Sequence, residues 1–393
     1  MVAVSLKKKK KKKESNHIPD YRDERNTKKN REEGYFNCIP FDEMERLEKY
    51  IPRIEQSTYY LVTANSGIGK SKLVRNLFIQ SPYEYVKNHP EDDIKLDIIY
   101  FSLEESKEKV ILSLISKYLY YRHRLSIGIK KLQSIGRHNT ISPDILEKIK
   151  EAKDYVNEFL EKVQIVDYVR NPTGMYKYVR NFMMSIGDYY DKDGNRLNKD
   201  LIVRGAGDEY TKIDKFIKNH PKHYVIVITD HVKLMSFEKD LNTTKAVIDK
   251  WSSDYCLHLR DKLGVTIVNV QQQAADKEKM QFTSTGKSIE EKLEPSLDGL
   301  GEHKLTQQDC NIAIGLFAPA RYDIQEHNGY NILELRDFYR SLSILKNRDG
   351  DSNIHVPLFF NGAADVFREL PRAEDYESLQ QVKNAILRIE TNS

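Results

Sequence analysis

The stretch of sequence that decides the fold is Tyr59-Tyr60-Leu61-Val62-Thr63-Ala64-Asn65-Ser66-Gly67-Ile68-Gly69-Lys70-Ser71. Its first residues predict a buried strand, and helix-like sequence follows over residues 70–78. A glycine-rich loop that joins a strand to a helix and ends in Gly-Lys-Ser is typical of a phosphate-binding loop. Backbone N–H groups of such a loop point inward, and the helix N-terminus adds a positive partial charge where the phosphates bind.

Two side chains of this loop fit direct roles in nucleotide binding. Lys70 can reach the β- and γ-phosphates, and the Ser71 hydroxyl can ligate Mg²⁺. Ala64 stands where glycine is commonest, and its small size meets the same need. A chance glycine loop is a weak alternative, because the flanking strand and helix are both present. We therefore expect ATP with Mg²⁺ to bind the residues Ala64, Asn65, Ser66, Gly67, Ile68, Gly69, Lys70 and Ser71.

Outward from the loop, the chain alternates strand and helix signals, which favours an α/β fold with a mainly parallel sheet flanked by helices. A long helix is expected over 107–120, and Ser142-Pro143 opens another, since Ser can cap it and Pro suits its first turn. Near the end, 342–345 and 354–360 flank a polar turn and predict an antiparallel hairpin, with a second turn at Asn361-Gly362. The other expected strands are 59–62, 98–101, 163–166, 224–228, 265–270 and 312–317.

Acidic residues follow two of the expected strands. Asp230 ends an apolar strand, the usual way to aim a carboxylate at the Mg²⁺ of a phosphate-loop ATPase, although an aspartate there is often a turn or cap residue. Glu104 would lie beside the γ-phosphate and polarise water, because ligands bind at the C-terminal strand ends of such sheets. The alternative is that Glu104 or Glu105 only favours a helix N-terminus. Position alone does not separate these two interpretations.

Composition excludes several classes of protein. The 393 residues are 39% hydrophobic and 31% charged, and no apolar run approaches the ~18–20 residues of a membrane helix. The N-terminal lysine run has no apolar segment after it, which argues against a secretory signal. The cysteines Cys38, Cys256 and Cys310 form neither a disulfide framework nor a CxxC pair. We therefore expect a cytoplasmic protein without a zinc site or a membrane partner.

Positive charge is concentrated in residues 1–34, which hold 12 Lys and Arg against 6 Asp and Glu. Their net charge of +6 exceeds the chain total of +4, so the remaining residues carry −2. We expect 1–34 to be a basic disordered tail with a possible linker helix, and either a polyanion binder or a solubility tail. The ATPase domain is expected over 35–371, and a charged C-terminal helix or tail over 372–393.

Five motifs together resemble those of DnaB-type replicative helicases of superfamily 4, which are hexameric motors with a RecA-like core. They occur in the family's order between residues 36 and 370, which is hard to obtain by chance. The resemblance implies an ATP-dependent hexameric DNA helicase that translocates on single-stranded DNA during DNA replication. The matching residues are 99–106, 227–235, 267–273, 302–311, and 344–348 together with 359–362.

The resemblance also implies roles for single residues around the nucleotide. Lys70 and Ser71 match the phosphate loop of the family. Glu104 matches its catalytic glutamate, which favours the water-activating interpretation over the helix-terminus one. Asp230 matches the aspartate that organises Mg²⁺.

Three further residues match positions that sense or complete the site. Gln272 matches a sensor glutamine, whose amide can detect the γ-phosphate. Lys346 and Arg348 match a Lys-x-Arg pair that enters the neighbouring subunit's site, where it neutralises charge that develops during phosphoryl transfer. The alternative for this pair is a solvated hairpin edge.

The sequence also departs from the family. Only about 35 polar residues precede the motor, where members carry a collar domain that contacts primase. A contact with primase or a helicase loader is therefore open, and a stripped, phage-encoded motor acting in a bacterial host's cytoplasm is favoured. Ala274-Ala275 replace an Asn-Arg pair, Gly301 replaces a DNA-contacting Arg, and 183–217 looks like an insertion.

DNA contacts would then fall to the polar loop 274–308, which the resemblance places in the pore of a ring. The alternative is a surface loop, since Glu278, Glu290, Glu291 and Glu294 nearly cancel its positive charge. Its lysines are Lys277, Lys279, Lys287, Lys292 and Lys304.

Two other functions stay open at this point. One is a RecA-like ATPase of recombination or annealing, and the other is a non-motor DNA-binding adaptor with a RecA-like fold. The Ser-Leu-Glu element and the Lys-x-Arg hairpin favour the helicase over the first. The intact residues Lys70, Ser71, Glu104, Asp230 and Gln272 argue against the second.

Overall fold

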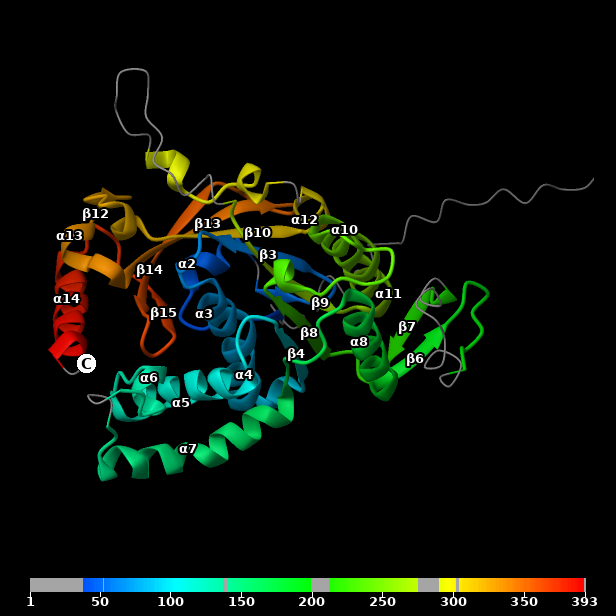
Figure 1. The fold of residues 1–393 in the computed structure, drawn as a ribbon, viewed down its shortest axis with the longest axis horizontal. Coiled ribbons are helices and arrows are strands. Elements are labelled where there is room, and N and C mark those ends of the chain that lie inside the picture. The colour runs from blue at the N-terminus through cyan, green and yellow to red at the C-terminus, as the bar shows by residue number, and fades with distance from the viewer. Residues whose placement is uncertain are drawn as a thin grey trace, which may run out of the picture. The chain divides into compact units, whose positions relative to one another are not determined.

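The centre of the molecule is a nine-stranded sheet of order β15-β14-β13-β10-β3-β9-β8-β4-β5 (Figure 1). The computed structural model describes residues 38–51, 53–136, 140–198, 212–274, 290–301 and 304–391. The strands are β3 (Tyr59–Ala64), β4 (Lys95–Ser102), β5 (Val163–Val166), β8 (His223–Asp230), β9 (Thr266–Gln272), β10 (Ile312–Phe317), β13 (Tyr339–Asn347), β14 (Ile354–Asn361) and β15 (Val366–Glu369). The expected α/β fold with a C-terminal antiparallel hairpin is confirmed.

The six strands from β10 to β5 are parallel, so their C-terminal ends lie at one edge of the sheet. Ala64 pairs with Gln272 on one side and with Leu316 on the other. Ser102 pairs with Asp230. This edge therefore carries the ends of β3, β9, β8 and β4, where the predicted nucleotide-binding residues lie.

Helices cover both faces of the sheet (Figure 1). One face packs against α3 (Lys70–Arg75), α4 (Ser81–Asn88), α5 (Lys107–His123) and α7 (Pro143–Lys162). The other packs against α8 (Pro172–Ile186), α10 (Thr244–Asp249) and α11 (Leu257–Leu263). The π-helical segments η1 (Asn76–Gln80) and η5 (Lys250–Cys256) join α3 to α4 and α10 to α11.

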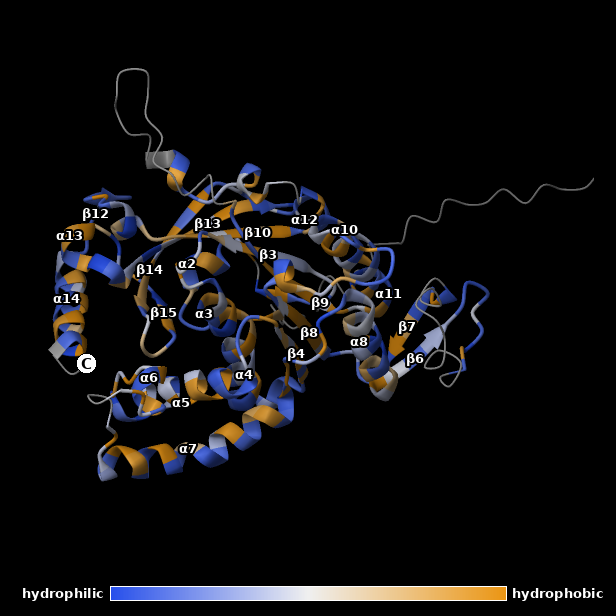
Figure 2. Cartoon of the chain, viewed as in Figure 1, coloured by the Kyte–Doolittle hydropathy of each residue, from blue (hydrophilic) through white to orange (hydrophobic). Residues whose placement is uncertain are grey.

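The alternation of side chains along each strand produces two separate cores. In β3, Tyr60 and Val62 join the core under α3 and α5, whereas Tyr59 and Leu61 join the core under α8 and α11. All eight residues of β8 are buried. Such strands read as continuous apolar runs because both of their faces are buried. Each buried Val or Ile stabilises the fold by about 1.5–3 kcal/mol. Figure 2 shows these apolar strands inside and a mixed surface on α7.

The helix start at Ser142-Pro143 and the turn at Asn361-Gly362 are both present in the structure. Ser142 Oγ accepts a hydrogen bond from Ile145 N at 3.4 Å, at the start of α7. The second turn lies between β14 and β15, which pair antiparallel. The smaller elements are β1 (Cys38–Ile39), α2 (Glu45–Glu48), β2 (Ile54–Glu55), α6 (Ile129–Leu132), α12 (Lys304–Asp309), β11 (Glu326–His327), β12 (Tyr330–Asn331) and α13 (Ile332–Leu335).

The expected insertion 183–217 begins inside a helix, because its first residues complete α8. After α8, β6 (Gly187–Tyr190) and β7 (Lys215–Lys218) pair as an antiparallel hairpin, and residues 199–211 lie outside the described residues. The expected tail 1–34, part of the polar loop (275–289) and 302–303 lie outside them as well.

At the C-terminus, α14 (Tyr376–Thr391) contributes Leu379 and Ile386 to a third apolar cluster. No helix in the described part of the chain combines the length and apolar character of a membrane span.

Candidate active site

The loop between β3 and α3 depends on two glycines with left-handed backbone. Gly67 has φ +71° and Gly69, which precedes the first residue of α3, has φ +109°. A Cβ at Gly69 would also lie 3.3 Å from the Phe360 ring. Only glycine adopts this conformation without strain, so both positions are fixed by the path of the loop. Lys70 is buried, and its Nζ donates to the Asn65 carbonyl at 3.0 Å, across the inside of the loop.

A hydroxyl and a carboxylate meet beside this loop. Ser71 Oγ donates to Asp230 Oδ1 at 3.1 Å, and Tyr100 OH donates to Asp230 Oδ2 at 2.8 Å. Asp230 is 1% exposed, and burial raises the pKa of its carboxyl. A cation beside Asp230 would offset the cost of keeping that charge buried.

The donor set at Ser71 and Asp230 fits Mg²⁺. This ion prefers oxygen ligands and is usually held by one or two carboxylates together with phosphates and water. Among the described residues, no group of three or more His, Cys, Asp or Glu side chains is placed to hold a metal. An ion at Ser71 and Asp230 would take its other ligands from phosphate and water, as is usual for Mg²⁺.

The adjacent acids Glu104 and Glu105 have different surroundings. Glu105 Oε2 accepts a hydrogen bond from Arg75 Nη1 at 2.5 Å. Glu104 is exposed and makes no hydrogen bond or ion pair with another described residue. Burial and the Asp230 charge raise the pKa of the Glu104 carboxyl, while Lys70 opposes the shift. Of the two acids, Glu105 is therefore paired with Arg75, whereas Glu104 is the one influenced by the charges of Asp230 and Lys70 and unpaired among the described residues.

Gln272 lies at the end of β9, next to the phosphate loop. Lys233 N donates to His231 Nδ1 at 3.3 Å, which leaves His231 Nε2–H to donate to Gln272 Oε1 at 3.3 Å. Burial and the nearby Lys70 charge lower the pKa of His231 to about 4. The imidazole is therefore neutral at pH 7 and orients the Gln272 amide.

Lys346 and Arg348 lie at the opposite edge of the sheet from these residues. Asn347, between them, pairs with Ile312 at the start of β10, whereas Ala64 pairs with Leu316. Measured along β10, the level of Asn347 and the level of Ala64 are therefore about 13 Å apart, at ~3.3 Å per residue. Both side chains bind backbone carbonyls near the end of α12: Lys346 Nζ donates to Gln307 at 2.6 Å and to Cys310 at 2.7 Å, and Arg348 Nη2 donates to Gln308 at 2.6 Å. The structure does not bring this pair to the phosphate loop of its own chain.

Residues that the sequence analysis missed hold the outer side of the loop. Arg340, 3% exposed, donates through Nε to Ile68 O at 3.0 Å and lies over the Phe360 ring at 4.6 Å. Arg321 donates to Ser66 O, and Asn65 Nδ2 donates to Tyr322 OH at 2.6 Å. The one signal for this role was an arginine within the apolar run of β13.

A cavity of about 700 Å³ adjoins this side of the loop. It is large enough for the part of a nucleotide that extends beyond the phosphates. Its lining includes Gly67, Ile68, Arg321, Arg336, Asp337 and Arg340.

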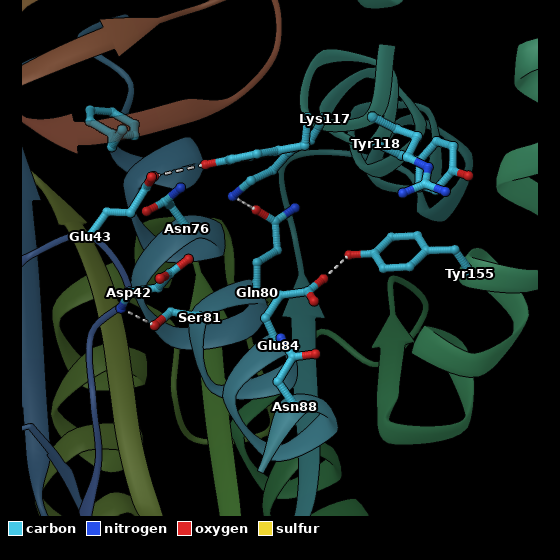
Figure 3. Close-up of a pocket in the computed structure, with 13 residues that line it drawn as sticks. Asp42, Glu43, Asn76, Gln80, Ser81, Glu84, Asn88, Lys117, Tyr118 and Tyr155 are labelled. Carbon is cyan, nitrogen blue, oxygen red and sulfur yellow. Dashed lines mark hydrogen bonds between the residues drawn. The ribbon is translucent and has the colours of Figure 1, made fainter. Parts of the chain in front are cut away.

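A second cavity, of about 380 Å³, lies elsewhere, among α4, α5 and α7 (Figure 3). Glu84 Oε1 accepts from Tyr155 OH at 2.5 Å, and Lys117 donates to the Gln80 side chain. Burial lowers the pKa of Lys117 to about 8. No residue of 64–71 lines this cavity, so it is separate from the phosphate loop.

Comparison with known proteins shows which solved structures share this fold. No family model matches the chain, and no curated protein matches it. Among solved structures, the "ATPase Domain of G40P" is 18% identical, with TM-score 0.59 over 88% of this chain and 96% of that one. A DnaB-like replicative helicase, described with its interactions with primase, is 18% identical, with TM-score 0.61 over 89% of this chain and 68% of that one. The chain therefore has the RecA-like fold of DnaB-type helicase ATPase domains.

Proposed function

We propose that the protein is an ATP-dependent DNA helicase, which translocates on single-stranded DNA as a homo-hexamer during DNA replication. The observation that carries the proposal is the group at the sheet edge. Lys70 crosses the loop, Ser71 meets Asp230 at 3.1 Å, and the Glu104 carboxyl lies near enough for the charges of Asp230 and Lys70 to shift its pKa. The shared fold supports the same function.

The residues of this chain divide the work of ATP hydrolysis. Loop N–H groups and Lys70 hold the β- and γ-phosphates, while Ser71 and Asp230 hold Mg²⁺. When bound, the ion neutralises charge that develops on the phosphate oxygens. Glu104 orients the attacking water and accepts its proton.

Gln272 and the Lys346–Arg348 pair extend the site. The Gln272 amide, oriented by His231, detects the γ-phosphate at the end of β9. β9 leads directly into the polar segment 274–308, which we propose contacts DNA. The whole segment is expected from the sequence to be a loop, but its last residues, from Lys304, form the first part of α12. Lys346 and Arg348 cannot reach the phosphate loop of their own chain, so any catalytic role must be played at a neighbouring subunit.

The proposed partners are single-stranded DNA and further copies of this chain. The similar structure of a DnaB-like replicative helicase includes its interactions with primase. Primase or a helicase loader is a possible partner here by the same resemblance, and the proposed location is the cytoplasm.

The test is ATP hydrolysis with and without single-stranded DNA, together with the mass of the ATP-bound assembly. The proposal expects stimulation by DNA and the mass of a hexamer. A filament of indefinite mass would instead favour a recombination ATPase. Absence of hydrolysis, with DNA binding retained, would favour a non-motor adaptor.

A further inference from the structure

The helix after the phosphate loop carries a second buried cation. Arg75 lies one turn beyond Ser71, on the same face of α3, and is 3% exposed. Its Nη1 donates to Glu105 Oε2 at 2.5 Å, and its Nη2 donates to Asp365 Oδ2 at 2.7 Å. One guanidinium therefore joins two carboxylates that are 30 and 290 residues away in sequence.

The Asp365 end of this contact is firmly fixed. Asp365 lies in the turn between β14 and β15 and is 2% exposed. It also accepts from Ser113 and pairs with Lys72 at 2.7 Å. Burial opposes its ionisation, but Arg75 and Lys72 outweigh burial and lower the pKa of Asp365 to about 2. Two cations of α3 therefore tie the C-terminal turn to the phosphate-loop helix.

The Glu105 end fixes the segment that carries Glu104. Leu103 N donates to Asp230 O at 2.6 Å, and Leu103 O accepts from Arg170 Nη2 at 2.5 Å. Ser102 Oγ donates to Glu105 O at 2.6 Å. With the Arg75 contact, the backbone is held on both sides of Glu104, while the Glu104 side chain itself has no bond to another described residue.

We propose that Arg75, Glu105 and Asp365 form a positioning bridge that holds Glu104 in register with the phosphate loop during ATP hydrolysis. The inference rests on the function proposed above. Because Ser71 and Arg75 share one face of α3, the Mg²⁺ ligand and the Glu104 segment are both placed by the same rigid helix. Misplacement of a reacting group by about 1 Å can lower a rate on the order of 10²-fold, so the bridge acts on turnover.

The experiment compares two substitutions at Glu105 in the full chain. Glu105→Gln keeps a side-chain oxygen that can accept from Arg75, whereas Glu105→Ala removes it. The matched control is Glu108→Ala, an exposed acid on the next turn. The measurements are kcat and KM for ATP with single-stranded DNA, the Kd of a fluorescent ATP analogue, and the thermal midpoint as a check on folding.

The bridge predicts that Glu105→Ala lowers kcat at least about 10-fold, while KM and Kd change less than about 2-fold. Glu105→Gln should stay within about 3-fold of wild type, because the conservative change keeps the hydrogen bond. Glu108→Ala should match wild type.

Wild-type kcat in Glu105→Ala, with Glu104→Gln inactive, would overturn the bridge alone. Equal losses in Glu105→Ala and Glu105→Gln would also overturn it, since they would show that charge rather than positioning matters. A wild-type protein that does not hydrolyse ATP would overturn the proposed function and this inference together.

Discussion

Residues at the C-terminal ends of the parallel strands and residues at the opposite, N-terminal ends differ in which groups they bind. At the edge with the C-terminal strand ends, Ser71 of α3 donates to Asp230 of β8, and Lys70 donates across the loop to the Asn65 carbonyl. At the other edge, Lys346 and Arg348 bind only backbone carbonyls near the end of α12. The first edge is a site assembled within one chain. The second is a cation pair whose proposed substrate charge lies on another chain.

The structure of one subunit gives the distances among residues of a single chain, but not those to a neighbouring subunit. Residues that meet at a strand end can be judged by distances within the chain. Lys346 and Arg348, which we propose act across an interface, are held within their own chain by helix-terminal carbonyls that carry partial negative charge. The predictions below separate these two kinds of residue.

The largest effect is expected at the phosphate loop. Lys70→Ala should abolish ATP hydrolysis, because the phosphates lose the lysine that crosses the inside of the loop. Steady-state turnover with single-stranded DNA measures this. A variant that retains more than about a tenth of wild-type turnover would contradict the phosphate-loop assignment.

The next effect tests the opposite edge. Arg348→Ala should lower turnover on the order of 10³-fold while ATP binding stays intact, if the guanidinium acts at a neighbour's site. Arg196→Ala is the matched control, because Arg196 also lies after a hairpin strand in an exposed ion pair, with Asp188 at 2.6 Å. Such a surface pair contributes little to stability, because solvent screens it. Equal turnover in the two variants would assign Arg348 to a surface role.

A smaller loss of turnover is expected at Glu104. Glu104→Gln should bind ATP and assemble, but should hydrolyse about 10²-fold more slowly, because an amide cannot take a proton from water. Glu105→Gln provides the comparison, since the structure engages Glu105 with Arg75. If Glu105→Gln proves inactive and Glu104→Gln active, the two acids have exchanged roles.

The smallest effect concerns stability. The folded pKa of Asp365 is about 2, below the ordinary value of 3.8, so its ionisation stabilises the fold above pH ~4. That contribution is lost as pH falls from ~4 to ~2. Asp365→Asn should lower the free energy of unfolding by about 2 kcal/mol at pH 7, and its difference from wild type should shrink below pH ~4. Urea unfolding across this range measures it, with the exposed Asp144→Asn as control. A difference that does not change with pH would contradict the assignment.

The sequence predicted the six parallel strands well because most of their residues are buried, so that each reads as an apolar run, as β8 does. The phosphate loop and Asp230 were predictable for a related reason, since a parallel sheet brings strand ends together without further information. What sequence could not supply were pairings set by packing. Arg75 finds Asp365 across 290 residues, and nothing local to either residue indicates the contact. Arg340 stands out as an arginine within an apolar run, but its partner was not predictable, because Ile68 O is a backbone atom.

Mixing two inactive proteins would show whether Arg348 acts on a neighbouring subunit. In a mixed assembly of Lys70→Ala and Arg348→Ala subunits, some interfaces combine an intact phosphate loop with an intact Arg348 from the neighbouring chain. Each variant alone should be inactive, and part of the DNA-stimulated ATP hydrolysis should return on mixing. Failure to recover activity, with subunit exchange shown separately by fluorescence, would contradict the claim that the far edge of the sheet works across an interface.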